Sequence, residues 1–358
     1  TYVELIDKTH YLNHYYFVSI IAFMMALLPA HRAFSLDVRR KPKLRLQQIP
    51  AWMILVLQVQ LAIVYFYAGL AKLHPDWLFH AMPLRIWLPP LADMPLIGWL
   101  FPYKETAFAF SWFGVLYDLT IPFLLWWNRT RPLAYIAVVA FHVMTWIMFP
   151  IGMFPWIMML STLIFFSEAF HERILNVMGK LLRKFSVRSP FSPTREERRR
   201  QNPWLFRLFL FHIVLQLLIP WRFLLYPGKL FWHEQGFRFS WRVMLMEKNG
   251  SAFFTVRDPD TQREWDPTLS EFLTPRQEKM MATQPDMILQ TAHLLRDTYA
   301  PVCKCEPEVY AQVYVSLNGR RNRPFIDPKV DLASIEPGWE ARYWVLPYPF
   351  GPSPQTHD

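Results

Sequence analysis

Long apolar stretches dominate the first two thirds of the chain, whereas polar and charged residues dominate the last third. Six apolar segments stand out, and several approach the about 20 residues that a helix needs to cross a bilayer. They cover residues 11–30, 50–73, 107–127, 133–149, 154–167 and 205–226. The fourth and fifth segments are short, so we expect them to cross a membrane only inside a bundle. The pattern predicts an α-helical multi-pass membrane bundle.

Two prolines interrupt the apolar sequence between the fourth and fifth segments. Pro150 and Pro155 bracket residues 151–154. Because proline breaks a helix, the same stretch is also compatible with one long broken segment, or with a re-entrant one that lines a cavity. The sequence leaves these alternatives open.

The last third of the chain alternates apolar and polar residues, which is typical of half-buried strands. Strands are expected at Ala252–Val256, Gln312–Leu317 and Arg342–Leu346, with one helix over residues 275–299. Asn318-Gly319 is a strong turn signal. We therefore predict two domains: residues 1–226 form the membrane bundle, and residues 227–358 form an α+β, β-rich extramembrane domain.

Positive charge is concentrated between the apolar segments, as in cytoplasmic loops. Residues 31–49, 128–132 and 171–204 are basic and should lie inside, whereas residues 74–106 carry little positive charge and should lie outside. The basic groups of the stretch 171–204 are Arg173, Lys180, Arg183, Lys184, Arg188, Arg195 and the Arg198–Arg200 run. Six spans then place the chain start and everything after Pro227 outside. We expect a preceding span or signal upstream of Thr1. Residues 74–106, rich in proline and aromatic side chains, should form interfacial half-helices.

Composition narrows the function classes. The hydrophobic content of 53% exceeds what soluble proteins usually carry. The net charge of +10 falls in loop blocks that should contact membrane lipids, so no nucleic-acid partner is expected. Cys303 and Cys305 have no His or Cys partners at metal-ligand spacing, so we expect no metal site and a structural or incidental role for both.

Four ionisable residues lie within the apolar segments, where burial of charge is costly. Lys72 and His14 lie near the outer ends of their segments, His142 lies in the outer half of the fourth, and Asp118 lies near the middle of the third. An amine partly desolvated by Tyr65, Phe66, Tyr67 and Leu73 would have a lowered pKa and would suit a general base. The alternatives are a lysine that extends to the interface, hydrogen-bonded structural histidines and an aspartate that makes a bundle contact. We expect His212 to be structural.

The same residues fall within motifs that resemble the vitamin K-dependent γ-glutamyl carboxylase family and its bacterial relatives, which share the horizontally transferred transmembrane (HTTM) domain. Matching motifs run in order along nearly the whole chain. They are residues 5–9 (LIDKT), 13–15 (NHY), 63–73 (IVYFYAGLAKL), 76–77 (DW), 116–120 (LYDLT), 141–142 (FH), 151–154 (IGMF), 239–241 (FSW), 314–318 (YVSLN) and 325–331 (FIDPKVD).

The resemblance implies roles for particular residues. Lys72 matches the family's catalytic base, which deprotonates vitamin K hydroquinone, and His14 matches an active-site histidine that assists carboxylation. His142, Asn13, Asp118 and Trp241 are assigned to cofactor binding. The implied cofactors are vitamin K hydroquinone (phylloquinol or menaquinol), O2 and CO2, and the implied class is carbon-carbon lyase. An apolar chamber would exclude the water that quenches the strong base formed on oxygenation.

Departures from the family pattern leave alternatives. The animal enzymes continue well beyond Asp358 and carry a disulfide without evident counterparts here. The family's YGYSW stretch reads FRFSW at residues 237–241, so two phenol hydroxyls are absent. The expected partner is a Glu-containing peptide on the extracytoplasmic side. The alternatives are hydroquinone epoxidation without carboxylation and a non-catalytic quinone-binding or transport protein. The expected location is a bacterial inner membrane or the endoplasmic reticulum, with the C-terminal domain periplasmic or lumenal.

Overall fold

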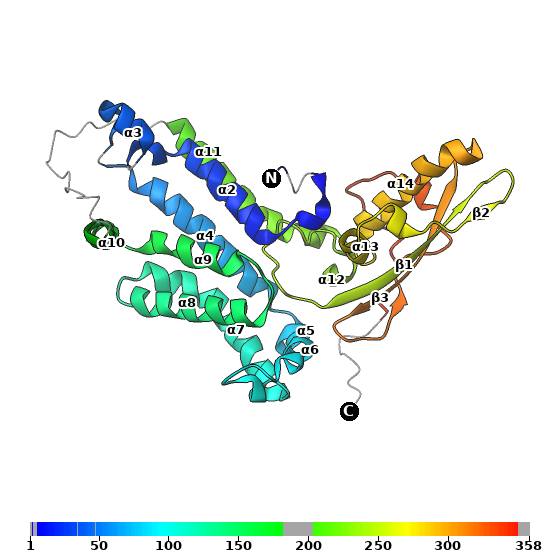
Figure 1. Ribbon diagram of the computed structural model, residues 1–358, viewed down its shortest axis with the longest axis horizontal. Helices are drawn as coiled ribbons and strands as arrows, with labels where there is room; N and C mark the ends of the chain where they lie inside the picture. Colours follow the sequence, from blue (N-terminus) through cyan, green and yellow to red (C-terminus); the bar gives the residue numbers. More distant parts are fainter. Residues whose placement is uncertain (1, 3–5, 34, 47, 182–202, 350–358) are drawn as a thin grey trace. The chain divides into compact units, whose positions relative to one another are not determined.

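The computed structural model describes residue 2 and residues 6–33, 35–46, 48–181 and 203–349 (Figure 1). It divides into two compact units. Unit 1 comprises residues 1–13, 68–116 and 219–358, and unit 2 comprises residues 14–67 and 117–218. The predicted basic residues Arg183 to Arg200, and the start of the motif at Leu5, lie outside the described residues. The predicted domain limits at residues 226 and 227 stay a prediction.

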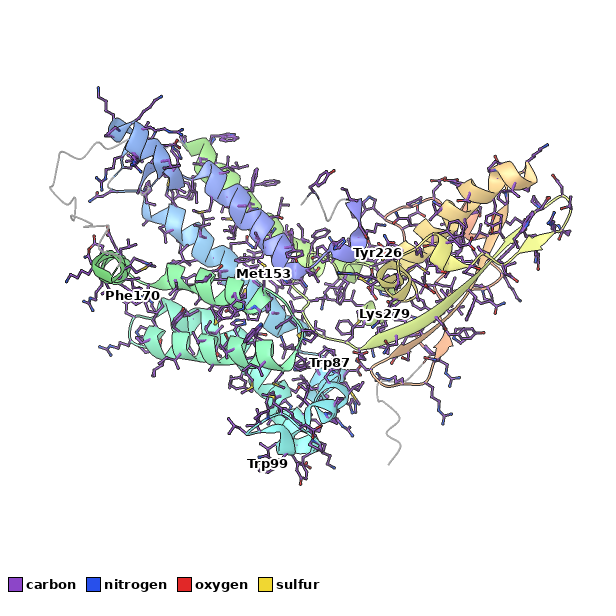
Figure 2. The ribbon with its side chains drawn as sticks, viewed as in Figure 1. Trp87, Trp99, Met153, Phe170, Tyr226 and Lys279 are labelled. Carbon is purple, nitrogen blue, oxygen red and sulfur yellow. A yellow bond between two sulfur atoms is a disulfide. The ribbon has the colours of Figure 1, made fainter. Side chains whose placement is uncertain are left out.

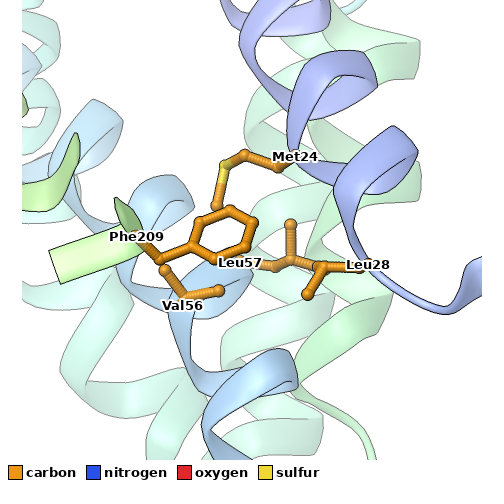
Figure 3. Packing of buried hydrophobic residues seen from close by; sticks show 5 residues of the cluster. All are labelled: Met24, Leu28, Val56, Leu57 and Phe209. Atoms are coloured by element: carbon orange, nitrogen blue, oxygen red, sulfur yellow. The ribbon is translucent and has the colours of Figure 1, made fainter. Parts of the chain in front are cut away.

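Unit 2 is helical, and its longest elements are apolar along their whole length. Its helices are α2 (Asn13–Leu27), α3 (Leu36–Arg40), most of α4 (Ala51–Ala71), the second half of α7 (Lys104–Trp126), α8 (Arg131–Met148), α9 (Phe154–Thr162), α10 (Glu168–Leu181) and α11 (Pro203–Leu218), with short 3-10 turns at Ala30–Arg32, Pro42–Leu44 and Leu163–Phe165. Helices α2, α4 and α11 meet in a buried cluster (Figure 3), made of Met24, Leu28, Val56, Leu57 and Phe209.

Polar side chains also join these helices. His212 Nε2 lies 2.8 Å from Gln60 Oε1, Gln216 donates to Tyr16 Oη at 2.9 Å, and Gln58 donates to the Ile164 carbonyl at 3.0 Å. Inside an apolar bundle, side-chain hydrogen bonds of this kind fix which helices are neighbours. The structural role expected for His212 agrees with its bond to Gln60.

The apolar helices are fewer than the six predicted segments. Within the described residues, α4, α7, α8 and the stretch Pro203–Leu225 are each long and apolar enough to cross a membrane. Counting the bent pair 154–165 and 168–180 as one gives five. Helix α2 has only 15 residues, which gives about 22 Å at 1.5 Å per residue and falls short of a bilayer core of about 30 Å. The number six stays a prediction.

The two prolines mark a reversal of the chain. Helix α8 ends at Met148 with Phe149 extended, α9 begins at Phe154, and the two helices pack against each other. They are therefore separate helices and not one broken helix. After Phe165 the direction changes by 119°, and α10 begins at Glu168. The predicted fifth segment is thus a short helix that turns sharply into an amphipathic one.

Residues 74–106, in unit 1, form the short helices expected from their prolines. They are α5 (Pro75–Leu78), α6 (Leu84–Trp87) and 3-10 turns at Pro89–Leu91 and Gly98–Leu100, followed by the start of α7. Trp87 and Trp99 are labelled on this segment in Figure 2. Trp87 donates its indole N–H to Glu247 Oε2 at 2.6 Å, which ties α6 to the residues before the sheet.

The rest of unit 1 is built on a four-stranded antiparallel sheet in the order β2-β1-β3-β4. Its strands are β1 (Lys248–Arg257), β2 (Glu264–Trp265), β3 (Glu308–Leu317) and β4 (Arg323–Pro324). Helices α13 (Pro275–Met281) and α14 (Pro285–Cys303) pack on one face (Figure 1). The short helices are α12 (Leu230–His233) and 3-10 turns at Lys8–His10, Ile219–Leu225, Leu269–Glu271 and Leu332–Ser334. The membrane-type helices followed by this sheet confirm the predicted fold class.

Alternating burial along the two long strands explains the sheet. Phe254 and Val256 of β1, and Val309, Ala311, Val313, Val315 and Leu317 of β3, are buried beneath the helices. The strands predicted at Ala252–Val256 and Gln312–Leu317 are therefore confirmed and extend further. Asn318 and Gly319 have φ of 51° and 72° in the turn between β3 and β4, as their sequence predicts.

Two predictions for this region are wrong. The single helix 275–299 is two helices, because Pro285 disfavours helical backbone at Gln284, which is extended with φ −117° and ψ 113°. Residues 342–346 do not form a strand; Val345 makes an isolated bridge with Ile326, and the alternation reflects the burial of Trp344 and Val345. Cys303 and Cys305 form a disulfide with each other, a structural pairing that the sequence did not reveal.

Candidate functional site

Lys72 lies directly after α4 and is buried. Only 7% of the residue is exposed, and its Nζ donates to the Ala68 carbonyl at 3.2 Å. The same nitrogen lies 5.5 Å from the centre of the Trp77 ring, and a Cβ built on Gly114 would be 3.9 Å from Lys72 Cε. The amine is therefore packed within unit 1 and does not extend into solvent, as a lysine at a helix end commonly does.

Two of the four residues expected to shield Lys72 are partly exposed. Phe66 and Leu73, expected from the sequence to desolvate the amine, are 39% and 47% exposed. An aromatic contact comes from Trp77 on α5, and the lysine stem also lies beside Gly114 on α7. Tyr65 and Tyr67, the other two residues expected to desolvate the amine, are buried, and their role beside Lys72 stays a prediction.

In unit 2, the two predicted histidines share an aromatic neighbour. The His14 ring is 5.8 Å from the ring of Phe154, and the His142 ring is 5.7 Å from the same ring. His142 is 1% exposed, and its Nε2 lies 3.1 Å from Tyr65 Oη. Its Nδ1 is buried and has no hydrogen-bond partner within the described part of the chain. His142 thus presents one ring nitrogen to an aromatic surrounding.

Further rings complete that surrounding. Tyr117 stacks on Phe141 with centroids 4.2 Å apart, and both rings lie within 6.4 Å of His142. Asp118, the next residue on α7, is 5% exposed. The predicted cofactor-binding residues His142 and Asp118 therefore both belong to the helical unit and are both buried, one of them among aromatic rings.

Asn13 and Trp241 are brought together in unit 1. Asn13 Nδ2 donates to the Arg242 carbonyl at 2.7 Å, and the Phe239 amide donates to Tyr11 Oη, which donates to Asn13 Oδ1. Trp241 is fully buried beside this contact. The start of the chain and the FSW motif therefore form one structure, which their separation of more than 200 residues conceals in the sequence.

A buried ionic cluster next to Lys72 was not foreseen. The Asp76 carboxylate accepts hydrogen bonds from Arg320 at 2.8 and 3.2 Å, from Asn318 at 3.0 Å and from Lys229 at 3.3 Å. Burial alone would raise the pKa of Asp76, but the bonds from Arg320 and Asn318 and the charges of Lys229 and Arg320 outweigh it and lower the pKa to about 2. In the sequence, this cluster is indicated only by Asp76 itself, which precedes Trp77 in a segment with few charges.

Unit 1 also has a groove of about 640 Å³ outside the sheet. It is lined by the chain start, α14 and residues 335–344, including Lys8, His293, Trp339, Arg342 and Tyr343. Trp339 is 84% and Tyr343 is 76% exposed. The groove combines aromatic faces with both cationic and acidic side chains, the latter being Asp286, Glu336 and Glu340. Within the described residues, His, Cys, Asp and Glu side chains form no group of three or more that could hold a metal ion.

Comparison with known families gives two matches. Residues 1–170 match the model of the HTTM domain, and residues 201–350 match the model described as "Vitamin K-dependent gamma-carboxylase, lumenal domain". The chain belongs to the vitamin K-dependent gamma-glutamyl carboxylase family. No solved structure matches the chain.

Membership of the carboxylase family supports a vitamin K-dependent, carboxylase-like enzyme. Together with four to five apolar helices, it supports a membrane protein with a lumenal C-terminal domain. Unit 1 contains residues from both matched regions: Lys72, Asp76 and Trp77 lie in the HTTM match, whereas Lys229, Asn318 and Arg320 lie in the lumenal-domain match.

Proposed function

We propose that this carboxylase-family protein oxygenates vitamin K hydroquinone to its epoxide and uses the strong base so formed to carboxylate glutamate side chains of a peptide with CO2. The observation that carries the proposal is the burial of Lys72, whose amine contacts Trp77 and the Ala68 carbonyl and is shielded from water. A water-excluded amine at this family position suits proton abstraction from a phenol.

The residues of unit 2 fit a ring-shaped, partly polar cofactor. Aromatic rings from Tyr117, Phe141 and Phe154 surround His142, whose Nδ1 is buried and has no hydrogen-bond partner among the described residues. An apolar aromatic lining with one polar nitrogen is the usual character of a quinone-type site, since flat faces pack and a single polar group orients the ligand. Reduced vitamin K, when bound, supplies the base that removes the glutamate γ-proton.

The chain's own residues have separate tasks in this proposal. Lys72 takes the proton from the hydroquinone hydroxyl. His142 and Asp118 orient the cofactor ring, and His14 assists carboxylation. Asn13 and Trp241 shape the site from the FSW motif. We propose that the peptide approaches from the lumenal-domain side, where the groove near Trp339 offers exposed aromatic faces.

One assay tests the reaction. The purified full chain in lipid nanodiscs is incubated with reduced vitamin K, O2, labelled CO2 and a Glu-containing peptide, and epoxide and fixed label are measured in parallel. The proposal predicts both products in the presence of peptide. Epoxide without fixed label would instead favour an epoxidase that does not carboxylate protein. The absence of both products would exclude both activities.

A further inference from the structure

The Asp76 carboxylate ties the short helix α5 to the turn between β3 and β4. Arg320 binds both carboxylate oxygens from that turn, with N–O distances of 2.8 and 3.2 Å, and Asn318 adds a third bond. The Asp76 and Arg320 side chains are only 2% and 1% exposed. A bidentate arginine-carboxylate pair fixes orientation as well as distance. The turn therefore holds α5 in one orientation.

The next residue, Trp77, is fixed by two hydrogen bonds to Ser111. Its indole N–H donates to the Ser111 carbonyl at 2.9 Å, and Ser111 Oγ donates back to the Trp77 carbonyl at 2.6 Å. These reciprocal bonds join α5 to α7, and all the groups involved are buried. A displacement of α5 would have to break both bonds, so the indole is positioned by α5 and α7 together.

Lys72 lies against that indole. A Cβ on Gly114 would be 3.8 Å from Trp77 Cζ2 and 3.9 Å from Lys72 Cε, so the ring and the lysine stem share the surface that this glycine leaves open. The Lys72 nitrogen is 5.5 Å from the ring centre. A chain of direct contacts thus runs from Arg320 through Asp76 and Trp77 to the Lys72 amine, entirely within unit 1.

We propose that Asp76 and Arg320 are positioning residues for the Lys72 amine, so that a turn of the lumenal-domain region fixes the base of the membrane-domain region through α5 and Trp77. The catalytic consequence rests on the proposed function; the positioning itself does not. A buried ion pair often adds little net stability compared with apolar packing, and its best-attested value is to specify one arrangement. Here the specified arrangement is the one that keeps the amine packed.

The test uses Asp76→Asn and Arg320→Lys in the full chain in nanodiscs. Arg320→Lys keeps the positive charge and loses the bidentate geometry, and it serves if Asp76→Asn does not fold. The matched control is Glu234→Gln, which breaks another buried ion pair of unit 1, Glu234 with Lys248 at 2.7 Å. Three quantities are measured: the rate at which a small amine-reactive reagent modifies Lys72, with exposed Lys104 as internal reference, and kcat and KM for epoxidation.

We call Asp76→Asn and Arg320→Lys the clamp variants, because they alter the Asp76–Arg320 pair. The proposal predicts that both clamp variants raise the rate of Lys72 modification several-fold relative to Lys104, while Glu234→Gln does not. It also predicts a fall in kcat with little change in KM, because the amine is misplaced while cofactor binding is retained. Unchanged Lys72 modification in the folded clamp variants, or an equal rise in Glu234→Gln, would overturn it. If Lys72→Ala retained epoxidation while the clamp variants still exposed the amine, the proposed function would fail and the positioning would stand.

Discussion

At the residue scale, the buried environment of Asp76 strongly changes its chemistry. Asp76 is 1% exposed and faces the cations of Arg320 and Lys229. Removing its charge would leave the buried Arg320 cation without its carboxylate partner, a loss of about 3–5 kcal/mol for buried pairs of this kind. We therefore expect Asp76→Asn to be clearly destabilising at neutral pH.

The pH dependence of that loss follows from the lowered pKa. The folded-state pKa of Asp76 is about 2, below the ordinary value of 3.8. The ionised carboxylate therefore contributes stability that is fully present above about pH 4 and is lost as the pH falls through 2, and the shift corresponds to about 2 kcal/mol.

The measurement is the free energy of unfolding of wild type and Asp76→Asn in detergent between pH 6 and pH 2. The difference between them should be constant down to about pH 4 and should shrink below it. A difference that stayed constant to pH 2 would show that folding does not lower the pKa of Asp76.

At the element scale, α10 has the character of a helix that lies in a membrane surface. It follows a 119° turn, and Ile174, Val177 and Met178 expose 39%, 53% and 49% of their surface on one face. An i, i+3, i+4 apolar stripe opposite polar residues suits the boundary between acyl chains and headgroups. We expect that boundary to be its position.

Spin labels can locate α10, because Cys303 and Cys305 are disulfide-bonded and do not react with a thiol label. Labels on Met178→Cys and Asn176→Cys, on opposite faces of the helix, are compared in nanodiscs. The label at 178 should be accessible to O2 and protected from a water-soluble nickel complex, and the label at 176 should show the reverse. Equal access of the nickel complex to both would place α10 in water.

Element positions were predictable where one physical signal dominated. Continuous apolar segments of about bilayer length located α4, α7, α8 and α11, and period-two alternation located β1 and β3. The prediction was wrong where the local sequence signals were ambiguous. Pro285 was placed inside one long helix, although it begins α14, and the alternation at residues 342–346 was taken for a strand. The contacts of Lys72 with Trp77 and of Asp76 with Arg320 depend on tertiary packing, which no local pattern encodes.

At the scale of the whole molecule, charge asymmetry predicts the orientation in the membrane. The Arg129–Arg131 loop should face the cytoplasm and the sheet should face the opposite side. Asn128→Cys and Asp260→Cys place thiols at exposed positions of these two regions. An impermeant maleimide added to vesicles with the cytoplasmic side enclosed should label residue 260 and not residue 128. Labelling of residue 128 alone would show that the protein has the opposite orientation in the membrane.

The proposed reaction depends on Lys72 acting as the base. In the purified chain, Lys72→Ala should lose nearly all conversion of vitamin K hydroquinone to the epoxide, while folding and membrane insertion are retained, and a small added amine should restore part of the rate. Lys104→Ala, at an exposed position, should convert hydroquinone at the wild-type rate. Epoxide formation by Lys72→Ala at the wild-type rate would contradict the assignment of the base.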